Sequence, residues 1–144
     1  MNVDFAPTLL DMAGLNIPTE MQGKSFKSVF NDKTEYIRDA AYYHYYEYPI
    51  WHKVQPHYGI RTGRYKLIHF YYSMDEWELY DLKNDPQELV NIYANAPEVL
   101  ISDLKDKLTS LKKEFKDDYS IKQMKSMTDT VISRIYNEPN KLKK

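Results

Sequence analysis

Residues 58–82, YGIRTGRYKLIHFYYSMDEWELYDL, decide the fold of this 144-residue chain. The stretch contains three β-prone runs, at residues 58–62, 65–72 and 77–82. Gly63-Arg64 separates the first two runs, and the polar residues 73–76 separate the last two. Short polar turns between β-prone runs are typical of antiparallel hairpins. A further run at residues 40–48 brings the prediction to an antiparallel sheet of about four strands.

A long amphipathic helix is expected after the sheet. Pro97 begins it, and large apolar residues recur at helical spacing at Leu100, Leu104, Leu108, Leu111 and Phe115. One helix over one face of such a sheet forms a two-layer α+β unit. Residues 119–144 are expected to add one more helix around Met124, Met127, Val131, Ile132 and Ile135. Between sheet and helix, Asp85 to Glu88 resembles a small capping arrangement in which Glu88 reaches back to the backbone.

Two short helices are expected before the sheet. Asp4 caps the first, Pro7 suits its first turn and Gly14 ends it; Ser25 begins a second helix that carries Phe26. Helices this short are marginal alone, and the rest of the chain offers little surface to cover them. We therefore expect exposed apolar surface on residues 7–30 and self-association through it.

Composition excludes several classes of protein. The net charge of −1, from 20 basic and 21 acidic residues, disfavours a general nucleic-acid binder. The sequence has no apolar run of about 18 residues, so no membrane partner is expected. Residues 1–20 lack the pattern of a signal peptide. The absence of cysteine excludes thiolate metal sites and a cysteine nucleophile within these residues.

Side chains that could bind a ligand concentrate in one loop. His52 and His57 flank Pro56, and Arg61 follows on a predicted strand. A loop bracketed by prolines on a rigid sheet is a common way to present donors, and these residue types favour an anionic group. The alternative is that both histidines are ordinary polar loop residues and that Arg61 pairs with an acid.

Other candidates are better explained by structure. His44 and His69 lie within predicted strands and are expected to have structural roles. Asp117-Asp118 is expected to form a solvated helix end, and the tyrosines, 12 of 14 of which lie in residues 36–93, to form core and sheet surface rather than a sugar-stacking platform. No catalytic residues and no metal ligands are expected in this sequence, so the chain alone is predicted to be inactive.

Several motifs resemble type I sulfatases of the alkaline-phosphatase superfamily. The first is VDFAPTLLDMAG at residues 3–14, with MQGKSF at 21–26; YGIRTGRYKLI at 58–68 and ELYDLKNDPQELVN at 78–91 follow. The resemblance covers about residues 3–118 and is greatest to bacterial arylsulfatases and glycosaminoglycan sulfatases. It implies a catalytic α/β domain ending in residues 1–35, a C-terminal subdomain in 36–118 and an extension in 119–144.

The resemblance also implies what lies outside the matched segment. Family members carry a formylglycine, made from Cys or Ser before x-Pro-x-Arg, and acidic pairs that hold calcium; these groups are expected in an absent catalytic domain. The serines of this sequence do not begin such a motif. The family suggests a periplasmic or extracellular location.

The same resemblance assigns a substrate role to two residues of this chain. A histidine at the place of His57 looks like a contact to the substrate sugar, with His52 on the same loop. The expected partners are a sulfated carbohydrate and the sulfatase catalytic domain. The alternative function is a free-standing carbohydrate-binding or interaction module without catalysis.

Overall fold

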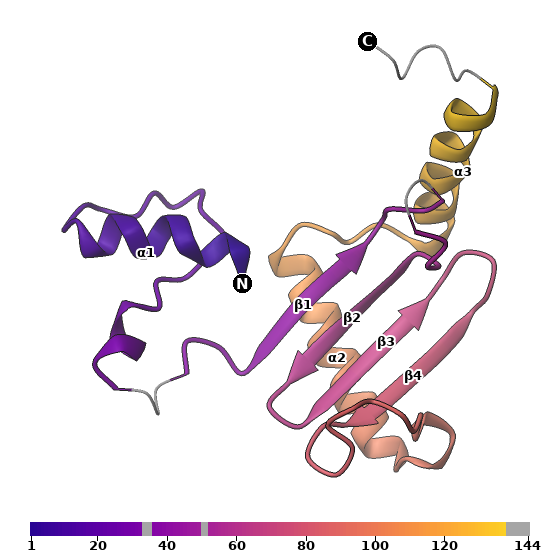
Figure 1. Cartoon of the computed structure of the whole chain (residues 1–144), viewed down its shortest axis with the longest axis horizontal. Helices are drawn as coiled ribbons and strands as arrows, with labels where there is room; N and C mark the ends of the chain where they lie inside the picture. The colour runs from indigo at the N-terminus through magenta and orange to yellow at the C-terminus, as the bar shows by residue number, and fades with distance from the viewer. Residues whose placement is uncertain (33–35, 50–51, 138–144) are drawn as a thin grey trace. The chain divides into compact units, whose positions relative to one another are not determined.

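The computed structural model describes residues 1–32, 36–49 and 52–137 (Figure 1). The chain forms two compact units, Met1–Ala41 and Tyr42–Lys144. Among the described residues, no helix combines the length and apolar character needed to cross a membrane.

The described residues of the first unit form three short helical segments and the start of the first strand. A 3-10 turn, η1 (Asn2–Asp4), runs into helix α1 (Phe5–Met12), and η2 (Lys27–Phe30) follows after a loop. The helix begins directly after Asp4, with Pro7 in its first turn as expected, but the side chain of Asp4 does not cap it. Gly14, at φ +72°, adopts the left-handed conformation expected just after the helix. The exposed fractions of Leu9 and Phe30, 66% and 63%, agree with the expected apolar surface.

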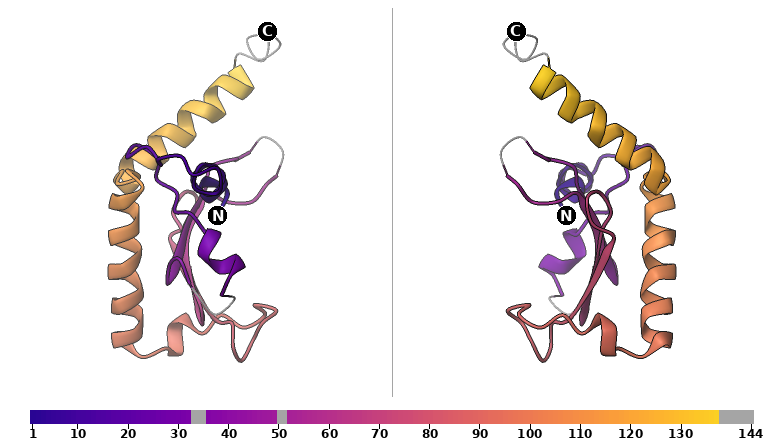
Figure 2. Two further views of the ribbon diagram at one scale, coloured as in Figure 1. Left: turned by 90° about the vertical axis from the view of Figure 1, so that its left-hand side faces the viewer. Right: turned by 90° about the vertical axis from the view of Figure 1, so that its right-hand side faces the viewer.

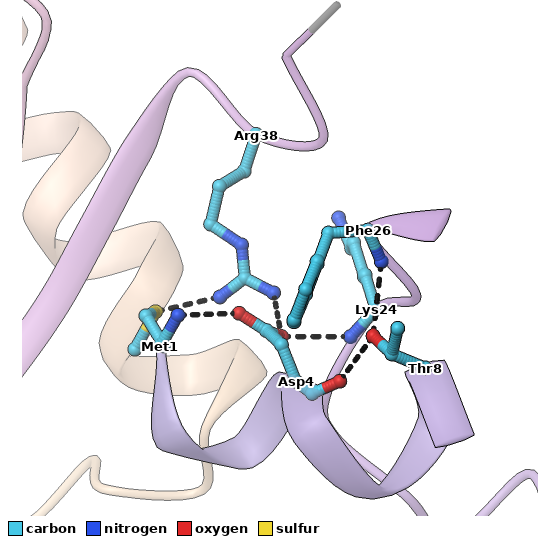
Figure 3. Close-up of polar contacts among 6 residues, drawn as sticks. All are labelled: Met1, Asp4, Thr8, Lys24, Phe26 and Arg38. Carbon is cyan, nitrogen blue, oxygen red and sulfur yellow. Dashed lines mark hydrogen bonds and ion pairs between the residues drawn. The ribbon is translucent and has the colours of Figure 1, made fainter. Parts of the chain in front are cut away.

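Asp4 instead organises the interior of this unit (Figure 3). Its fully buried carboxylate accepts a hydrogen bond from the Lys24 amide at 2.9 Å and forms an ion pair with Arg38 at 2.5 Å. The backbone oxygen of Asp4 accepts from the Thr8 hydroxyl, which itself accepts from the Phe26 amide. Burial would raise the pKa of Asp4, but the hydrogen bond from the Met1 ammonium, the hydrogen bond from the Lys24 amide and the Arg38 charge hold it below its usual value.

The second architectural element is the expected four-stranded antiparallel sheet. Its strands are β1 (Ala40–Tyr45), β2 (His57–Thr62), β3 (Tyr65–Phe70) and β4 (Glu76–Asp81), in the spatial order β1-β2-β3-β4. The register pairs Ile60 with Leu67 and Leu67 with Leu79, and all three side chains are fully buried. This row forms the centre of the core, because side chains that pair across strands share one face.

Helix α2 (Glu98–Glu114) covers that face, as Figure 2 shows with the sheet seen edge-on. Its buried residues, Leu104 and Leu108, are four apart and lie on one side of the helix. The second predicted helix also exists, as α3 (Ile121–Asn137), with Met124 and Thr128 buried. A short turn, η3 (Tyr93–Asn95), precedes α2. The α+β fold predicted from the sequence is therefore confirmed.

The expected capping arrangement at residues 85–88 is wrong. No helix begins there; the segment is a turn in which the Asp85 carboxylate accepts from the Val90 amide at 2.8 Å. Glu88 adopts φ +56° and forms an ion pair with Lys66 on β3 instead of reaching back to the backbone. The Lys66 ammonium binds the Glu88 carboxylate more strongly than a free backbone amide would, because it carries a full charge.

Removal of the Asp4 carboxylate is expected to loosen the first unit. Asp4→Ala leaves the guanidinium of Arg38 buried without its partner, which costs about 3–5 kcal/mol. The measurement is hydrogen exchange at the Lys24 and Phe26 amides, which should lose protection. Asp11→Ala is the control, because its ion pair with Lys27 is half exposed and the loss of such a pair is expected to cost little. Equal protection in the two variants would contradict this role of Asp4.

Candidate functional site

The two faces of the sheet have different chemistry because successive strand residues point to opposite sides. On β2, Tyr58 and Ile60 face α2, where Lys112 of the helix lies over the Tyr58 ring. His57, Gly59 and Arg61 therefore belong to the face opposite α2. The predicted ligand-binding residue His57 lies at the first position of this strand.

His57 lies in a cluster of aromatic rings on the face opposite α2. Its imidazole stacks on Tyr45 at 5.3 Å between ring centroids and contacts Phe70 at 5.0 Å and Tyr43 at 6.0 Å. Its Nδ1–H donates to the Gln55 carbonyl at 2.8 Å, which leaves Nε2 as the outward acceptor. The ring is half-buried and held from three sides, so its orientation is fixed before any ligand binds.

Gly59 explains why this cluster can form. A Cβ at Gly59 would lie 2.6 Å from the Tyr43 hydroxyl and 2.5 Å from the Leu67 carbonyl. Only glycine therefore lets the Tyr43 ring lie across β2. The Tyr43 hydroxyl is buried and lacks a hydrogen-bond partner within residues 36–49 and 52–137. Burial raises the pKa of Tyr43, so this phenol stays protonated as a donor.

His52 is not brought together with His57. It is exposed in the loop before β2, and no ring contact or hydrogen bond between the two imidazoles occurs in the described part of the chain. Arg61 is also exposed, at the far end of the same strand. Trp51, which the sequence places in this loop, lies outside the described residues. Both histidines as substrate contacts stay predictions.

The expectation that Asp117 is solvated is wrong. Asp117 is 7% exposed, and its Oδ2 accepts from the Tyr42 hydroxyl, from His44 Nδ1 at 2.6 Å and from the Tyr46 hydroxyl at 2.9 Å. We call these four side chains the Asp117 hub. The chain brings Asp117 there by a turn after α2 in which Lys116 adopts φ +56° and the Asp117 amide bonds the Lys112 carbonyl. This is the Schellman arrangement without glycine.

The sequence does carry a signal for the Asp117 hub. Tyr42, His44 and Tyr46 alternate along β1 and its end, so that three polar groups point to one face. A carboxylate just after the covering helix is the partner that such donors require when they are buried. Asp117 was not recognised as this partner because its charged neighbours, Lys113, Lys116 and Asp118, are typical of a solvated helix end.

The Asp117 hub fixes the protonation states of its members. Burial is the largest influence on the pKa of His44 and lowers it, although Asp117 opposes this effect. Burial would raise the pKa of Asp117, but the hydrogen bonds from Tyr42 and His44 outweigh it and lower the value. His44 is therefore a neutral imidazole that donates through Nδ1 to an ionised Asp117 and accepts from the Tyr71 hydroxyl at 2.9 Å.

His69 repeats this arrangement on β3. Its Nε2–H donates to Asp75 at 2.7 Å, its Nδ1 accepts from Tyr58 at 2.8 Å, and its ring stacks on Trp77 at 4.1 Å. Burial lowers its pKa, with Asp75 opposing. The contacts of His44 and His69 agree with the structural roles expected for both.

Neither formylglycine nor calcium can be assigned to residues of this chain. The sequence has no cysteine and no serine in the required motif. Across residues 1–32, 36–49 and 52–137, no group of three His, Asp or Glu side chains is arranged to hold a metal ion.

Comparison with known proteins identifies the class that this fold defines, the C-terminal part of sulfatases. A solved protein in complex with its substrate D-glucosamine-2-N,6-O-disulfate superposes with a TM-score of 0.77 at 48% identity, over 84% of this chain and 25% of that one. A solved 2-O glycosaminoglycan sulfatase superposes with a TM-score of 0.66 at 28% identity, over 81% of this chain and 25% of its own.

Sequence comparison gives the family. Residues 1–114 match the family described as N-sulphoglucosamine sulphohydrolase, C-terminal, and the chain belongs to it. An N-acetylglucosamine-6-O-sulfatase of Bacteroides thetaiotaomicron is 57% identical over 99 residues, which are 67% of this chain and 18% of that protein. Arylsulfatase K of Mus musculus is 32% identical over 118 residues, 76% and 20% of the two chains. The resemblance seen in the sequence motifs is thus confirmed.

The position of Asp117 predicts unequal effects of two neighbouring substitutions. Asp117→Ala removes the acceptor of three donors, of which Tyr42 and His44 have buried side chains. Each buried donor left unpaired costs about 1–3 kcal/mol. Asp118→Ala changes an exposed carboxylate and is expected to cost less than about 0.5 kcal/mol. Urea unfolding followed by tyrosine fluorescence measures both free energies. Similar values for the two variants would show that the Asp117 hub does not stabilise the sheet.

The lowered pKa values of His44 and His69 predict a loss of stability in weak acid. Between their folded-state pKa values and the unfolded value near 6.5, the unfolded chain binds more protons, so the free energy of unfolding falls as pH drops below about 6.5. The slope is up to about 1.4 kcal/mol per pH unit for each group. Urea titrations at several pH values from 7.5 to 5 measure it, with His44→Gln as the variant of smaller slope. A free energy of unfolding that does not change over this pH range in the wild type would contradict the assignment of neutral imidazoles to His44 and His69.

Proposed function

We propose that the chain is the C-terminal part of a sulfatase that hydrolyses sulfate esters of sulfated glucosamine-type saccharides. The observation that carries the proposal is the 57% identity to the N-acetylglucosamine-6-O-sulfatase, together with the 48% identity to the protein solved with D-glucosamine-2-N,6-O-disulfate. The chain spans about a fifth of the length of the curated relatives it matches, 18–21% for the first three. The cleavage chemistry, including formylglycine and calcium, belongs to a catalytic domain outside these residues.

Within such an enzyme, the face opposite α2 would contribute to the substrate pocket. The His57 imidazole is oriented by the Gln55 carbonyl and held between Tyr45 and Phe70, so its Nε2 can accept a hydrogen bond from a sugar hydroxyl. Aromatic rings with a fixed polar atom among them suit the mixed apolar and hydroxylated surface of a sugar. His57 orients the saccharide in this proposal and takes no part in breaking the ester bond. His52, which is exposed on the same loop, would make a weaker contact.

Two separate features of the chain also suit a protein partner. The buried Tyr43 hydroxyl without a partner is a donor that a neighbouring domain can satisfy. The exposed apolar side chains of the first unit, which include Phe5, Leu9 and Met12, fit a docking surface for the catalytic domain. In the isolated chain, the same apolar side chains of the first unit would favour self-association instead.

A chimera tests the proposed function. In the Bacteroides N-acetylglucosamine-6-O-sulfatase, the matching C-terminal segment is replaced by this chain, and sulfate release from N-acetylglucosamine-6-sulfate is measured. His57→Ala should raise KM about tenfold and leave kcat within about twofold, because a contact made equally in the ground and transition states affects binding alone. His52→Ala should raise KM less.

Two outcomes would reject the proposal. The first is sulfate release by the isolated 144-residue chain, with or without calcium, which would place the catalytic centre in these residues. The second is an inactive chimera that is folded by circular dichroism, combined with binding of the sugar by the isolated chain. That combination would favour the free-standing carbohydrate-binding module.

A further inference from the structure

A second candidate site lies on the other side of the sheet from His57. A groove of about 330 Å³ runs between α2 and the sheet, with Tyr58 and Trp77 on the sheet side. The helix side presents Lys105, Lys112 and Lys113. Because these lysines are at positions i, i+7 and i+8 of α2, they share one face of the helix.

Two of the ammonium groups are held over aromatic rings. The Nζ of Lys105 lies 4.2 Å from the centroid of Trp77 and donates to the Tyr93 hydroxyl at 2.8 Å. The Nζ of Lys112 lies 4.0 Å from the centroid of Tyr58. Ring faces attract a cation without taking up all of its three N–H donors. Both groups therefore keep donors for a ligand.

Carboxylates do not neutralise these two lysines. No ion pair joins Lys105 or Lys112 to an acidic side chain within residues 1–32, 36–49 and 52–137. Asp118 lines the groove but is exposed, so the wall carries three ammonium groups against one carboxylate. Burial lowers the pKa of Lys112 although Asp117 and Asp118 oppose it, as expected for a desolvated cation without a close partner.

The spacing of the two ammonium groups selects the kind of anion. Tyr58 pairs with His69, and His69 pairs with Trp77, so the two rings under the lysines lie in one row on strands β2 and β4. Neighbouring strands are about 4.8 Å apart, which places the two cations roughly 10 Å from each other. A single tetrahedral anion cannot bridge this distance. A chain that carries several anionic groups can.

We propose that this groove binds a sulfated saccharide chain, with one sulfate group at Lys105 and another at Lys112. Lys113 at the rim adds attraction for the chain as it leaves the groove. The choice of a sulfated saccharide among polyanions rests on the proposed function, which is drawn from an N-acetylglucosamine-6-O-sulfatase and from a protein solved with D-glucosamine-2-N,6-O-disulfate. The groove would hold a longer substrate by a part other than the sugar that contacts His57.

Calorimetric titration of the 144-residue chain with a heparin-derived tetrasaccharide tests this proposal. Lys105→Gln/Lys112→Gln should weaken binding at least about tenfold. The matched control, Lys122→Gln/Lys125→Gln, removes two lysines from α3 and should stay within about twofold. Lys105→Arg/Lys112→Arg keeps both charges and should retain binding within about threefold.

Three further measurements distinguish binding of a sulfated saccharide chain from binding of a single anion or of an unsulfated saccharide. Inorganic sulfate and a desulfated, N-acetylated tetrasaccharide should each bind at least tenfold more weakly than the sulfated tetrasaccharide. NMR signals of the Lys105 and Lys112 side chains should shift when the tetrasaccharide is added to the wild-type chain, which keeps the test valid if the glutamine variant does not fold. The side-chain signals of Lys105 and Lys112 report on the groove alone, whereas the KM of the chimera reports on His57, so failure at the groove and failure of the proposed function are distinguishable.

The proposal is overturned if the two double glutamine variants bind alike, or if the lysine signals do not move. It is also overturned if inorganic sulfate binds as well as the tetrasaccharide, since the two cations would then act separately. Equal affinity for a single-stranded DNA oligonucleotide of the same charge would show a general polyanion surface and reject the saccharide.

Discussion

Burial of the Asp117 carboxylate against the end of β1 is the constraint on which the unit from Tyr42 onwards depends. The carboxylate accepts from Tyr42, His44 and Tyr46 and thereby joins the turn after α2 to the first strand. A buried carboxylate is tolerated only when donors surround it, so the position of α2 and the rotamers of these side chains are set together. To bring Asp117 to β1, Lys116 has to adopt the left-handed conformation, which is unfavourable for a residue with a side chain.

Once α2 is held on one side, the sheet has two faces with separate uses. The covered face combines an apolar centre, Ile60, Leu67 and Leu79, with histidine–aspartate pairs and the lysines of α2. The opposite face presents the aromatic cluster around His57, which depends on the missing side chain of Gly59. This division suits the proposed function, in which one face of the chain meets a catalytic domain and a sugar.

The sequence predicted the elements that periodicity determines. Turns at residues 63–64 and 73–76 and leucines at helical spacing were sufficient for the sheet and α2. The motifs at residues 3–14, 21–26, 58–68 and 78–91 were together sufficient for the family. Periodicity could not reveal contacts between distant residues, such as Asp117 with His44 or Glu88 with Lys66. Both carboxylates looked like solvated or capping groups because local spacing says nothing about which donors the fold brings to them. The structure places His57 in a cluster of rings and does not bring His52 beside it, and the substrate role of both histidines stays a prediction.

The most direct test of the proposed role is an NMR titration of this chain, labelled at histidine, tyrosine and lysine side chains, with the catalytic portion of the Bacteroides N-acetylglucosamine-6-O-sulfatase. We expect the signals of Tyr43, Tyr45 and His57 to shift or broaden as the catalytic portion covers their face, whereas those of Lys105 and Lys112 stay in place. Shifts confined to the lysines, or no shifts at saturating concentrations, would contradict the claim that the face around His57 meets a sulfatase catalytic domain.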